Sequence, residues 1–358
     1  MTQFQVKKSD LASVRQVETP KASPGDSEAI LRVDRFALTA NNVSYGVIGE
    51  RLGYWNFFPP AQADGGDWGI IPVWGYADVI ESNVADLNEG DRLYGYFPMA
   101  DTLTITPTKI RADRVTDGAE HRAGLPPVYN QYQRGPREGK DMEAARMLLL
   151  PLYLTSFYIH DLLVDNDWFG AERVITVSAS SKTAIGFAYA MQGDSDAPDH
   201  RGLTSAGNRD FVNTLKAYGA VESYDDIAGI DASVPTVIID MSGNGAILGQ
   251  LHKLLGDNMK YTANVGLTHW EDNKMSADFI RDRSAMFFAP GQIQKRAQEF
   301  GAAVYEEKTS AYFKGAAKRS LDWLELKTVK DLANLEPVYQ DMLGGRINPV
   351  EGVLVEPN

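Results

Sequence analysis

The sequence predicts an α/β protein of two domains, one rich in β-strands and one built on a doubly wound parallel sheet. The chain has 358 residues, and at roughly 100–200 residues per domain this length suggests two domains. The first third holds short apolar stretches separated by Gly, Pro, Asn and Asp, whereas strands and helices alternate after residue 142. Such alternation is typical of βαβ units, which build parallel sheets.

The N-terminal part is expected to be β-rich over residues 1–115. Its strand-like stretches are AILRVDRFAL, VWGYADVIES, RLYGYF and TLTITP, each bounded by turn-forming residues. Residues 116–142 carry charge, glycine and proline, and are expected to form an exposed connector. The aromatic residues of this connector suggest that it packs against another part of the chain.

The C-terminal part alternates between two hydrophobic periods. EAARMLLLPLYLTSFYIHDLL has the spacing of a helix, and strands are expected at residues 173–180, 201–205, 235–243 and 259–270 with helices between them. Residues 290–301 and 316–343 are also expected to be helical. The tail RINPVEGVLVEP is predicted to be a last strand that returns to the first domain.

Composition excludes several classes of function. The formal net charge of -13 disfavours binding to nucleic acid or to anionic membranes. The absence of cysteine excludes disulfides, iron–sulfur clusters and a cysteine nucleophile. The five histidines are scattered, so no catalytic zinc site is expected. No secretory signal or run of 18 apolar residues is seen, and a cytoplasmic protein is expected.

The first strand of the alternating region leads into a turn that is compatible with binding a dinucleotide. A Rossmann fingerprint is G-x-G-x-x-G after a strand; here the turn is SASSKT, and a glycine appears only at Gly186. We expect Gly186 to allow close packing of the helix on the strand, as the third glycine does. The side chains that would hold the pyrophosphate are Ser180, Ser181, Lys182 and Thr183. The alternative is a capped helix start rich in Ser and Thr.

The second strand indicates which dinucleotide is bound. NAD-specific sites place an acid on the ribose 2′-hydroxyl about 20 residues after the glycines, but this strand ends without one. It ends instead in Thr204 and Ser205, and Asn208 and Arg209 follow. A guanidinium suits a 2′-phosphate, so NADP(H) is expected. The alternative is a helix capped by Thr204 or Ser205 with an exposed Arg209.

The chain resembles the medium-chain dehydrogenase/reductase superfamily, in particular its zinc-free quinone oxidoreductases and enoyl reductases. The likeness rests on VWGYADVIESNVADLNEGDRLYGYFP, LLLPLYLTSFYIHDLL, NTLKAYGAVESYDD and LANLEPVYQDMLGGRINPVEGVLVEP. WNFFP, IPVWG, GYFPM, LPPVYNQY and SASSKTAIG are similar to a branch known as a domain of unknown function. The resemblance implies a GroES-like catalytic domain at 1–143, completed by 320–358, and a Rossmann NADP(H)-binding domain at 144–319.

The resemblance also implies where catalytic residues would lie. TANNVSYG and the segment after it are similar to the family's nicotinamide-facing loop, and Thr155 lies where the helix before the first Rossmann strand faces the nicotinamide. The catalytic candidates are Tyr45, Tyr54 and Thr155, and the candidate substrate contacts are Asn42, Trp55, Asn130 and Tyr132. A phenol can donate a hydrogen bond to a carbonyl or enolate. The alternatives are that the aromatic residues are cleft walls or core, and that Thr155 bonds its own backbone.

These expectations together describe an NADPH-dependent reductase. Hydride would pass, in a cleft between the domains, to an activated C=C bond or a carbonyl of a small organic or acyl substrate, and a tyrosine or water would supply the proton. Among the histidines, His160 is expected to be a packed helix residue and only His269 to approach the cleft. The alternative is a non-catalytic protein that keeps the fold and acts as a sensor or scaffold. A homodimer through the Rossmann domain is an open option.

Overall fold

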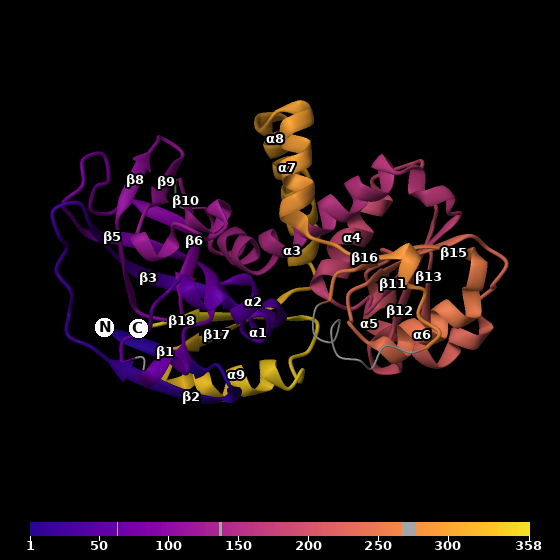
Figure 1. The fold of residues 1–358 in the computed structure, drawn as a ribbon, viewed down its shortest axis with the longest axis horizontal. Helices are drawn as coiled ribbons and strands as arrows, with labels where there is room; N and C mark the ends of the chain where they lie inside the picture. Colours follow the sequence, from indigo (N-terminus) through magenta and orange to yellow (C-terminus); the bar gives the residue numbers. More distant parts are fainter. Residues whose placement is uncertain (63, 136–137, 267–276) are drawn as a thin grey trace. The chain divides into compact units, whose positions relative to one another are not determined.

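Figure 1 shows a computed structural model of the chain, which describes all residues except 63, 136–137 and 267–276. The chain divides into two compact units. Unit 1 consists of Met1–Leu148 and Leu324–Asn358, and unit 2 of Leu149–Trp323. The boundaries expected from the sequence were residues 143 and 320. Unit 2 is therefore an insertion between two parts of unit 1.

Unit 1 is built mainly from antiparallel strands. Its strands are β1 (Thr2–Lys7), β2 (Asp10–Glu18), β3 (Ala29–Leu38), β4 (Trp68–Gly69), β5 (Pro72–Ser82), β6 (Arg92–Pro98), β7 (Thr102–Ile105), β8 (Pro107–Ile110), β9 (Arg114–Asp117), β10 (Gln131–Arg134), β17 (Glu325–Lys330) and β18 (Glu351–Glu356). The larger sheet has the order β17-β18-β3-β5-β6-β10-β9-β8, with β7 also paired to β3, and a small sheet has the order β2-β1-β4.

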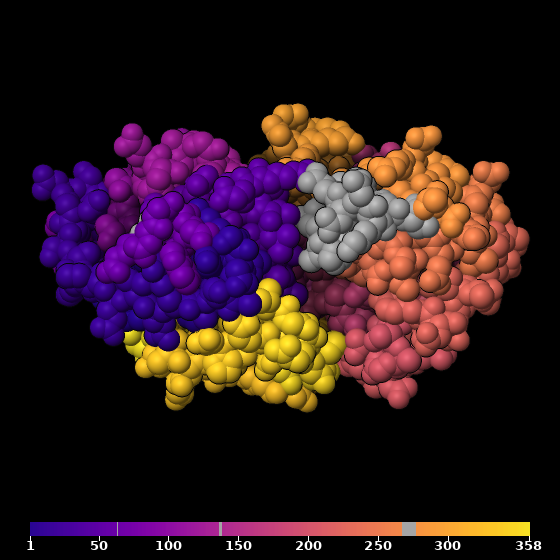
Figure 2. Space-filling view, turned by 60° about the horizontal axis from the view of Figure 1, so that its bottom comes forward, coloured from indigo at the N-terminus to yellow at the C-terminus, as the bar shows by residue number. Residues whose placement is uncertain are grey.

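The C-terminal segment completes unit 1. Strand β18 lies between β17, to which it is parallel, and β3, to which it is antiparallel. Figure 2 shows the C-terminal residues in yellow lying against the N-terminal residues in indigo. The helix α9 (Leu335–Leu343) adds to this contact, because the hydroxyl of Tyr339 donates to the carbonyl of Leu11 at 3.0 Å.

Unit 2 has a six-stranded parallel sheet with the order of a Rossmann fold. Its strands are β11 (Arg173–Val177), β12 (Asp199–Thr204), β13 (Ala220–Ser223), β14 (Thr236–Asp240), β15 (Met259–Asn264) and β16 (Ser284–Met286). The order β13-β12-β11-β14-β15-β16 is 3-2-1-4-5-6 in chain order, so the order reverses between β11 and β14. This confirms the predicted doubly wound sheet.

Helices cover both faces of that sheet because its strands are apolar on both sides. The helices of unit 2 are α4 (Lys182–Gln192), α5 (Arg209–Thr214), α6 (Gly245–Leu255), α7 (Ala289–Phe300) and α8 (Ala302–Leu321), while α3 (Lys140–Asp165) begins in unit 1. Val174 and Val237 pack with residues of α3 and α4, whereas Ile175 and Ile238 pack with residues of α6.

Helix α3 is long and apolar enough to cross a membrane by length and composition alone. This is weak evidence, because core helices of soluble proteins pass the same test. Ile159 and Leu163 of this helix are fully buried in the core of unit 2, against Val174 and Phe187. That burial is the ordinary reason for an apolar helix of this kind in a folded domain.

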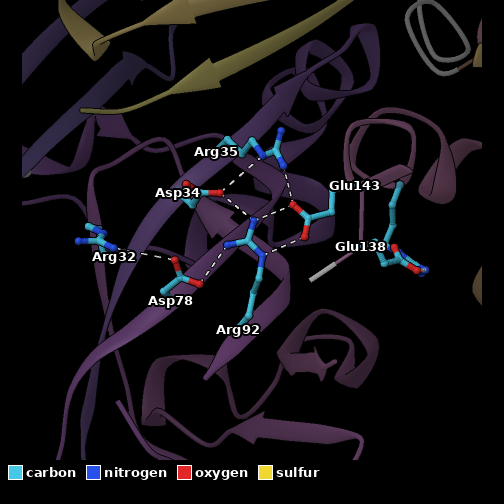
Figure 3. Close-up of polar contacts among 8 residues, drawn as sticks. Arg32, Asp34, Arg35, Asp78, Arg92, Glu138 and Glu143 are labelled. Carbon is cyan, nitrogen blue, oxygen red and sulfur yellow. Dashed lines mark hydrogen bonds and ion pairs between the residues drawn. The ribbon is translucent and has the colours of Figure 1, made fainter. Parts of the chain in front are cut away.

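The start of α3 is held to the sheet of unit 1 by a buried ionic network (Figure 3). Arg92, the first residue of β6, donates to Asp78 at 3.0 Å, to Glu143 at 2.8 Å and to Asp34 at 2.7 Å. Arg35 also donates to Glu143. Burial alone would raise the pKa of Glu143, but the hydrogen bonds from Arg92 and Arg35 outweigh it and lower that pKa. The carboxylate is therefore held ionised.

Two stretches differ from the sequence prediction. The connector expected at 116–142 contributes β10 and the short turns η3 (Glu120–Arg122) and η4 (Pro127–Asn130), and β10 joins β6 to β9 in the sheet. The helix expected at 316–343 is interrupted by the strand β17. The reason is that ELKTVK pairs along its whole length with β18, so tertiary pairing overrides the local pattern.

Candidate functional site

The turn between β11 and α4 keeps the geometry of a glycine-rich turn without its glycines. Ser178 has a φ of 63°, a left-handed conformation that usually selects glycine. Ser181 is the N-cap of α4 and accepts a hydrogen bond from the backbone N–H of Ala184 at 3.3 Å. The capping alternative is therefore correct for Ser181. It is compatible with anion binding, because the N-terminus of α4 presents unpaired N–H groups and a positive dipole end.

Gly186 does not have the role expected from the fingerprint. An added Cβ would lie 2.5 Å from Cδ1 of Tyr153 and 2.8 Å from Oγ of Ser156, and both residues belong to α3. The close approach at Gly186 is thus between two helices and not between helix and strand. The carbonyl of Gly186 also accepts a hydrogen bond from Tyr312 at 2.7 Å. Gly186 therefore fixes the position of α4, and it affects the turn before α4 only indirectly.

The residues after β12 meet the turn after β11. Oγ of Ser180 accepts hydrogen bonds from Thr204 at 3.3 Å and from the amide of Asn208 at 3.1 Å. Ser205 occupies the N-cap position of η6 (Ala206–Asn208) but makes no side-chain capping bond. Four of the predicted residues, Ser180, Thr204, Ser205 and Asn208, are therefore brought to one edge of the sheet.

The charges at this edge are those of exposed side chains. Arg209 begins α5, its side chain is 48% exposed, and it lies 3.6 Å from Asp226, which is 54% exposed. An exposed pair of this kind contributes at most about 1 kcal/mol, so it does not prevent Arg209 from contacting another anion. Lys182 and Thr183 lie in the first turn of α4 and are half-buried. The carbonyl of Thr183 accepts from Ser156 at 2.7 Å.

Unit 1 contributes an aromatic cluster around Tyr45, on helix α1 (Ala40–Val47). The Tyr45 oxygen accepts hydrogen bonds from the amide of Asn41 at 2.9 Å and from the indole of Trp74 at 3.4 Å. The donating atoms are the side-chain nitrogen of Asn41 and the indole nitrogen of Trp74, so the Tyr45 oxygen is the acceptor in both bonds. Burial raises the pKa of Tyr45 well above its usual value. This phenol therefore stays protonated.

Tyr54, in the turn η1 (Tyr54–Asn56), belongs to the same cluster. Its ring centroid lies 4.6 Å from that of Tyr45, and its hydroxyl lies 3.3 Å from that of Tyr129. Burial raises the pKa of Tyr54 to about 12. The connector residue Tyr129 also packs on Tyr96 and Trp74, with centroids 4.7 and 6.0 Å away. The aromatic residues of the connector thus close one side of the cluster.

Three predicted substrate contacts are used for internal structure. Asn42 is buried, and its amide accepts from the backbone of Thr39 at 2.7 Å and donates to the carbonyl of Pro72 at 2.9 Å. Trp55 is wedged between two glycines, so that an added Cβ at Gly69 would lie 2.4 Å from its ring. We therefore correct the expectation for Asn42 and Trp55, which cap α1 and fill the core.

Tyr132 is the third of these residues. It is fully buried, its hydroxyl donates to the carbonyl of Tyr96 at 3.0 Å, and it accepts from Arg122 at 3.2 Å. The residues of a strand alternate between its two faces, so Gln131, which precedes Tyr132 on β10, lies on the opposite face. Asn130, the last residue of η4, is the one predicted substrate contact that lines a cavity, and Gln131 lines the same cavity.

The remaining candidates have local roles in the part of the chain that is described. Thr155 donates to the carbonyl of Pro151 at 3.1 Å, as the backbone alternative expected. His160 bonds Asp194 at 3.0 Å and is a packed helix residue. His269 lies outside the described residues. Among those described, no group of three His, Asp or Glu side chains could hold a metal ion, so zinc independence stays a prediction.

Sequence reasoning missed Asn41, Trp74 and Tyr96 of the aromatic cluster. Asn41 and Trp74 donate to Tyr45, and the ring of the fully buried Tyr96 packs against that of Tyr45 with centroids 5.7 Å apart. One signal was present in the sequence. Asn41 stands four residues before Tyr45, a spacing that places two side chains on one face of a helix.

Comparison with known proteins supports this fold. The profile of a family described as "Protein of unknown function (DUF2855)" matches residues 36–348. No curated protein matches the sequence. Among solved structures, CurA from Vibrio vulnificus in complex with NADPH is similar, with a TM-score of 0.65 and 11% identity over 100% of this chain and 99% of that one.

Two further solved structures have the same fold. The CurK enoyl reductase has a TM-score of 0.62 and 15% identity, over 99% of this chain and 98% of that chain. The quinone oxidoreductase from Coxiella burnetii has a TM-score of 0.57 and 14% identity, over 99% of each chain. These similarities confirm the predicted medium-chain dehydrogenase/reductase fold, and the family match confirms the predicted branch of unknown function.

Proposed function

Since the chain belongs to the DUF2855 family and has the medium-chain dehydrogenase/reductase fold, we propose that it is an NADPH-dependent oxidoreductase. The observation that carries the proposal is the meeting of Ser180, Thr204 and Asn208 after the first two strands of the parallel sheet. This edge, beside the point where the strand order reverses, is where such sheets bind dinucleotides.

The pyrophosphate fits the start of α4. Helix N-termini bind phosphate because their N–H groups are unpaired and the dipole is positive there. The preceding residues, Ser178 to Ser181, have small side chains, so the backbone can approach a phosphate closely. Lys182 at the first position of the helix would offset part of the phosphate charge. Ser180 and Asn208 would orient the adjoining ribose.

The ribose 2′-phosphate fits the residues after β12. The stretch from Thr204 to Asn208 contains no acid, so nothing there repels a phosphate or binds the 2′-hydroxyl of NAD. The guanidinium of Arg209 is exposed and held only by a weak surface pair with Asp226. It can therefore turn to make the bidentate contact that a phosphate favours.

Tyr45 suits a role in binding the group that is reduced. NADPH supplies a hydride when it is bound, and negative charge then develops on an oxygen of a conjugated carbonyl. A protonated phenol that accepts hydrogen bonds from Asn41 and Trp74 would donate its own proton to that oxygen. We propose an activated C=C bond or a carbonyl of a small organic or acyl molecule as substrate.

The cofactor preference is tested by Arg209→Ala. NADPH affinity should fall by about 1.5–3 kcal/mol, the range for hydrogen bonds to charged groups, while NADH affinity stays nearly unchanged. Isothermal titration calorimetry of the full chain measures both. Arg346→Ala is the matched control, because Arg346 is also an exposed arginine paired with an acid, Asp341. Equal losses for both cofactors, or tighter NADH binding by the parent chain, would refute the assignment.

The role of Tyr45 is tested by Tyr45→Phe. Removal of one donor to a developing oxyanion typically lowers kcat by about 100- to 1000-fold, and NADPH affinity should not change. NADPH oxidation is followed with a panel of enones, quinones and ketones. Tyr339→Phe removes a phenol from the same unit and should leave kcat unchanged. A parent chain that binds NADPH and reduces nothing in the panel would favour a sensor, for which the missing turn glycines are the supporting observation.

A further inference from the structure

A polar cavity lies in unit 1, beside the turn η4 that carries Tyr129 of the aromatic cluster. Its volume is about 290 Å³, and it is lined by residues of β8, β9, η4 and β10. At roughly 30 Å³ per water molecule, this volume corresponds to about ten waters. The cavity therefore has room for a small organic molecule rather than for a single ion.

Positive charge dominates the lining of this cavity. Lys109, Arg111 and Arg114 contribute to it, and no acidic residue does. Arg114 is paired with Asp113 at 2.7 Å, whereas Lys109 and Arg111 have no acidic partner within 4 Å among the residues that the structure describes. The lining is thus opposite in sign to the chain as a whole, whose formal net charge is -13. Unpaired cations around a concave surface attract anions.

Neutral polar groups complete the lining. Thr116 and Gln131 contribute hydroxyl and amide groups, and Asn130 forms part of the wall. Asn130 is only 9% exposed, and its amide nitrogen donates to the carbonyl of Arg122 at 3.2 Å. Its Oδ1 has no partner among the described residues. A buried carbonyl without a donor is unfavourable, so a ligand N–H or O–H in its reach would be favoured.

We propose that this cavity binds a small organic anion, with a phosphate or carboxylate on Lys109 and Arg111 and a hydroxyl or amide N–H near Asn130. The two cations supply charge-assisted hydrogen bonds to the anionic oxygens. The neutral residues select a ligand that carries a donor beside its anionic group. The proposal does not depend on the dinucleotide site, because every residue in it belongs to unit 1.

Calorimetry of the full chain at low salt tests this site. The probes are glycerol 3-phosphate, glycerate, inorganic phosphate and glycerol. We expect glycerol 3-phosphate or glycerate to bind more tightly than inorganic phosphate, and glycerol not to bind; which of the two is tighter identifies the anionic group. The double variant Lys109→Gln, Arg111→Gln should weaken binding at least about tenfold, the loss of one charge-assisted bond.

Controls separate this cavity from other anion sites. Lys314→Gln, Lys318→Gln removes the same charge from exposed positions of α8 and should leave binding unchanged. Arg209→Ala should also leave it unchanged, since that residue lies in unit 2. Asn130→Ala should remove the preference for the donor-bearing ligand over inorganic phosphate. Three results would overturn the proposal. They are no binding of any anion, an equal loss of affinity in the cavity double variant and the α8 double variant, and a loss of affinity only in Arg209→Ala.

Discussion

Gly186→Ala should destabilise unit 2, because the new methyl group has no room. It would lie 2.5 Å from Cδ1 of Tyr153 and 2.8 Å from Oγ of Ser156. Tyr153 cannot easily move away, since it is fully buried and its hydroxyl bonds Ser320 at 2.6 Å. Overpacking of a close-packed core typically costs about 1–3 kcal/mol, and this contact is severe enough to expect about 2–3 kcal/mol.

The opposite sign is expected for the same substitution at Gly315. This glycine lies within helix α8, is exposed, and has no atom within 4 Å of an added Cβ. Alanine in a helix interior is more favourable than glycine by about 0.5–1 kcal/mol. Gly315→Ala therefore measures the gain in helix propensity alone. The same gain applies to Gly186→Ala, so a lower free energy of unfolding in that variant is evidence of a steric clash.

Urea denaturation followed by far-ultraviolet circular dichroism gives the free energy of unfolding of each variant. Thermal melting gives a second measure, because about 2–3 kcal/mol corresponds to a fall of roughly 4–12 °C for a domain of this size. If Gly186→Ala were neutral, or stabilising like Gly315→Ala, the inference that α4 packs closely on α3 at Gly186 would be refuted. NADPH affinity should fall less than stability, since Gly186 acts on the turn only through α4.

The remaining predictions concern charge and protonation. Lys182→Ala should weaken NADPH binding by about 1.5–3 kcal/mol with little change in Tm, because Ser181 and not Lys182 caps α4; an unchanged Kd would remove its phosphate role. Burial lowers the pKa of His252 from 6.5 to about 4. As the pH falls, His252 is therefore protonated in the unfolded chain before it is protonated in the folded chain. The contribution of neutral His252 to the free energy of unfolding is complete above pH 6.5 and falls by up to about 3 kcal/mol towards pH 4. His252→Gln should show a shallower loss over this range, and equal pH slopes for both proteins would contradict the assignment.

The sequence predicted the architecture well because the fold depends on patterns that a chain displays locally. The strand RVITV is buried at every position, so an unbroken apolar run was enough to identify it. Strand β17 was missed because its residues are mostly exposed and its stability comes from pairing with β18. No local period reveals a partner that is 26 residues away.

The candidate site could be predicted only where position along the chain determines it. Thr204 is the last residue of β12, and Ser180 and Asn208 lie in the turns after β11 and β12, so parallel pairing places all three at one edge. Trp55 and Tyr132 were misassigned because a side chain's direction depends on distant residues. Trp55 is buried because Gly49 and Gly69 leave space for it, and neither glycine signals this in the sequence.

The position of β18 has a consequence for how the protein is made. The chain is synthesised from the N-terminus at about 5–20 residues per second, so unit 2 is complete at Trp323 while unit 1 still lacks β17 and β18. Until then the edge of β3 that later pairs with β18 is open, and an unpaired edge invites association with other chains. Unit 2 is thus synthesised in full before unit 1 has all its strands, and the nascent chain carries the open edge of β3 until β18 has been made.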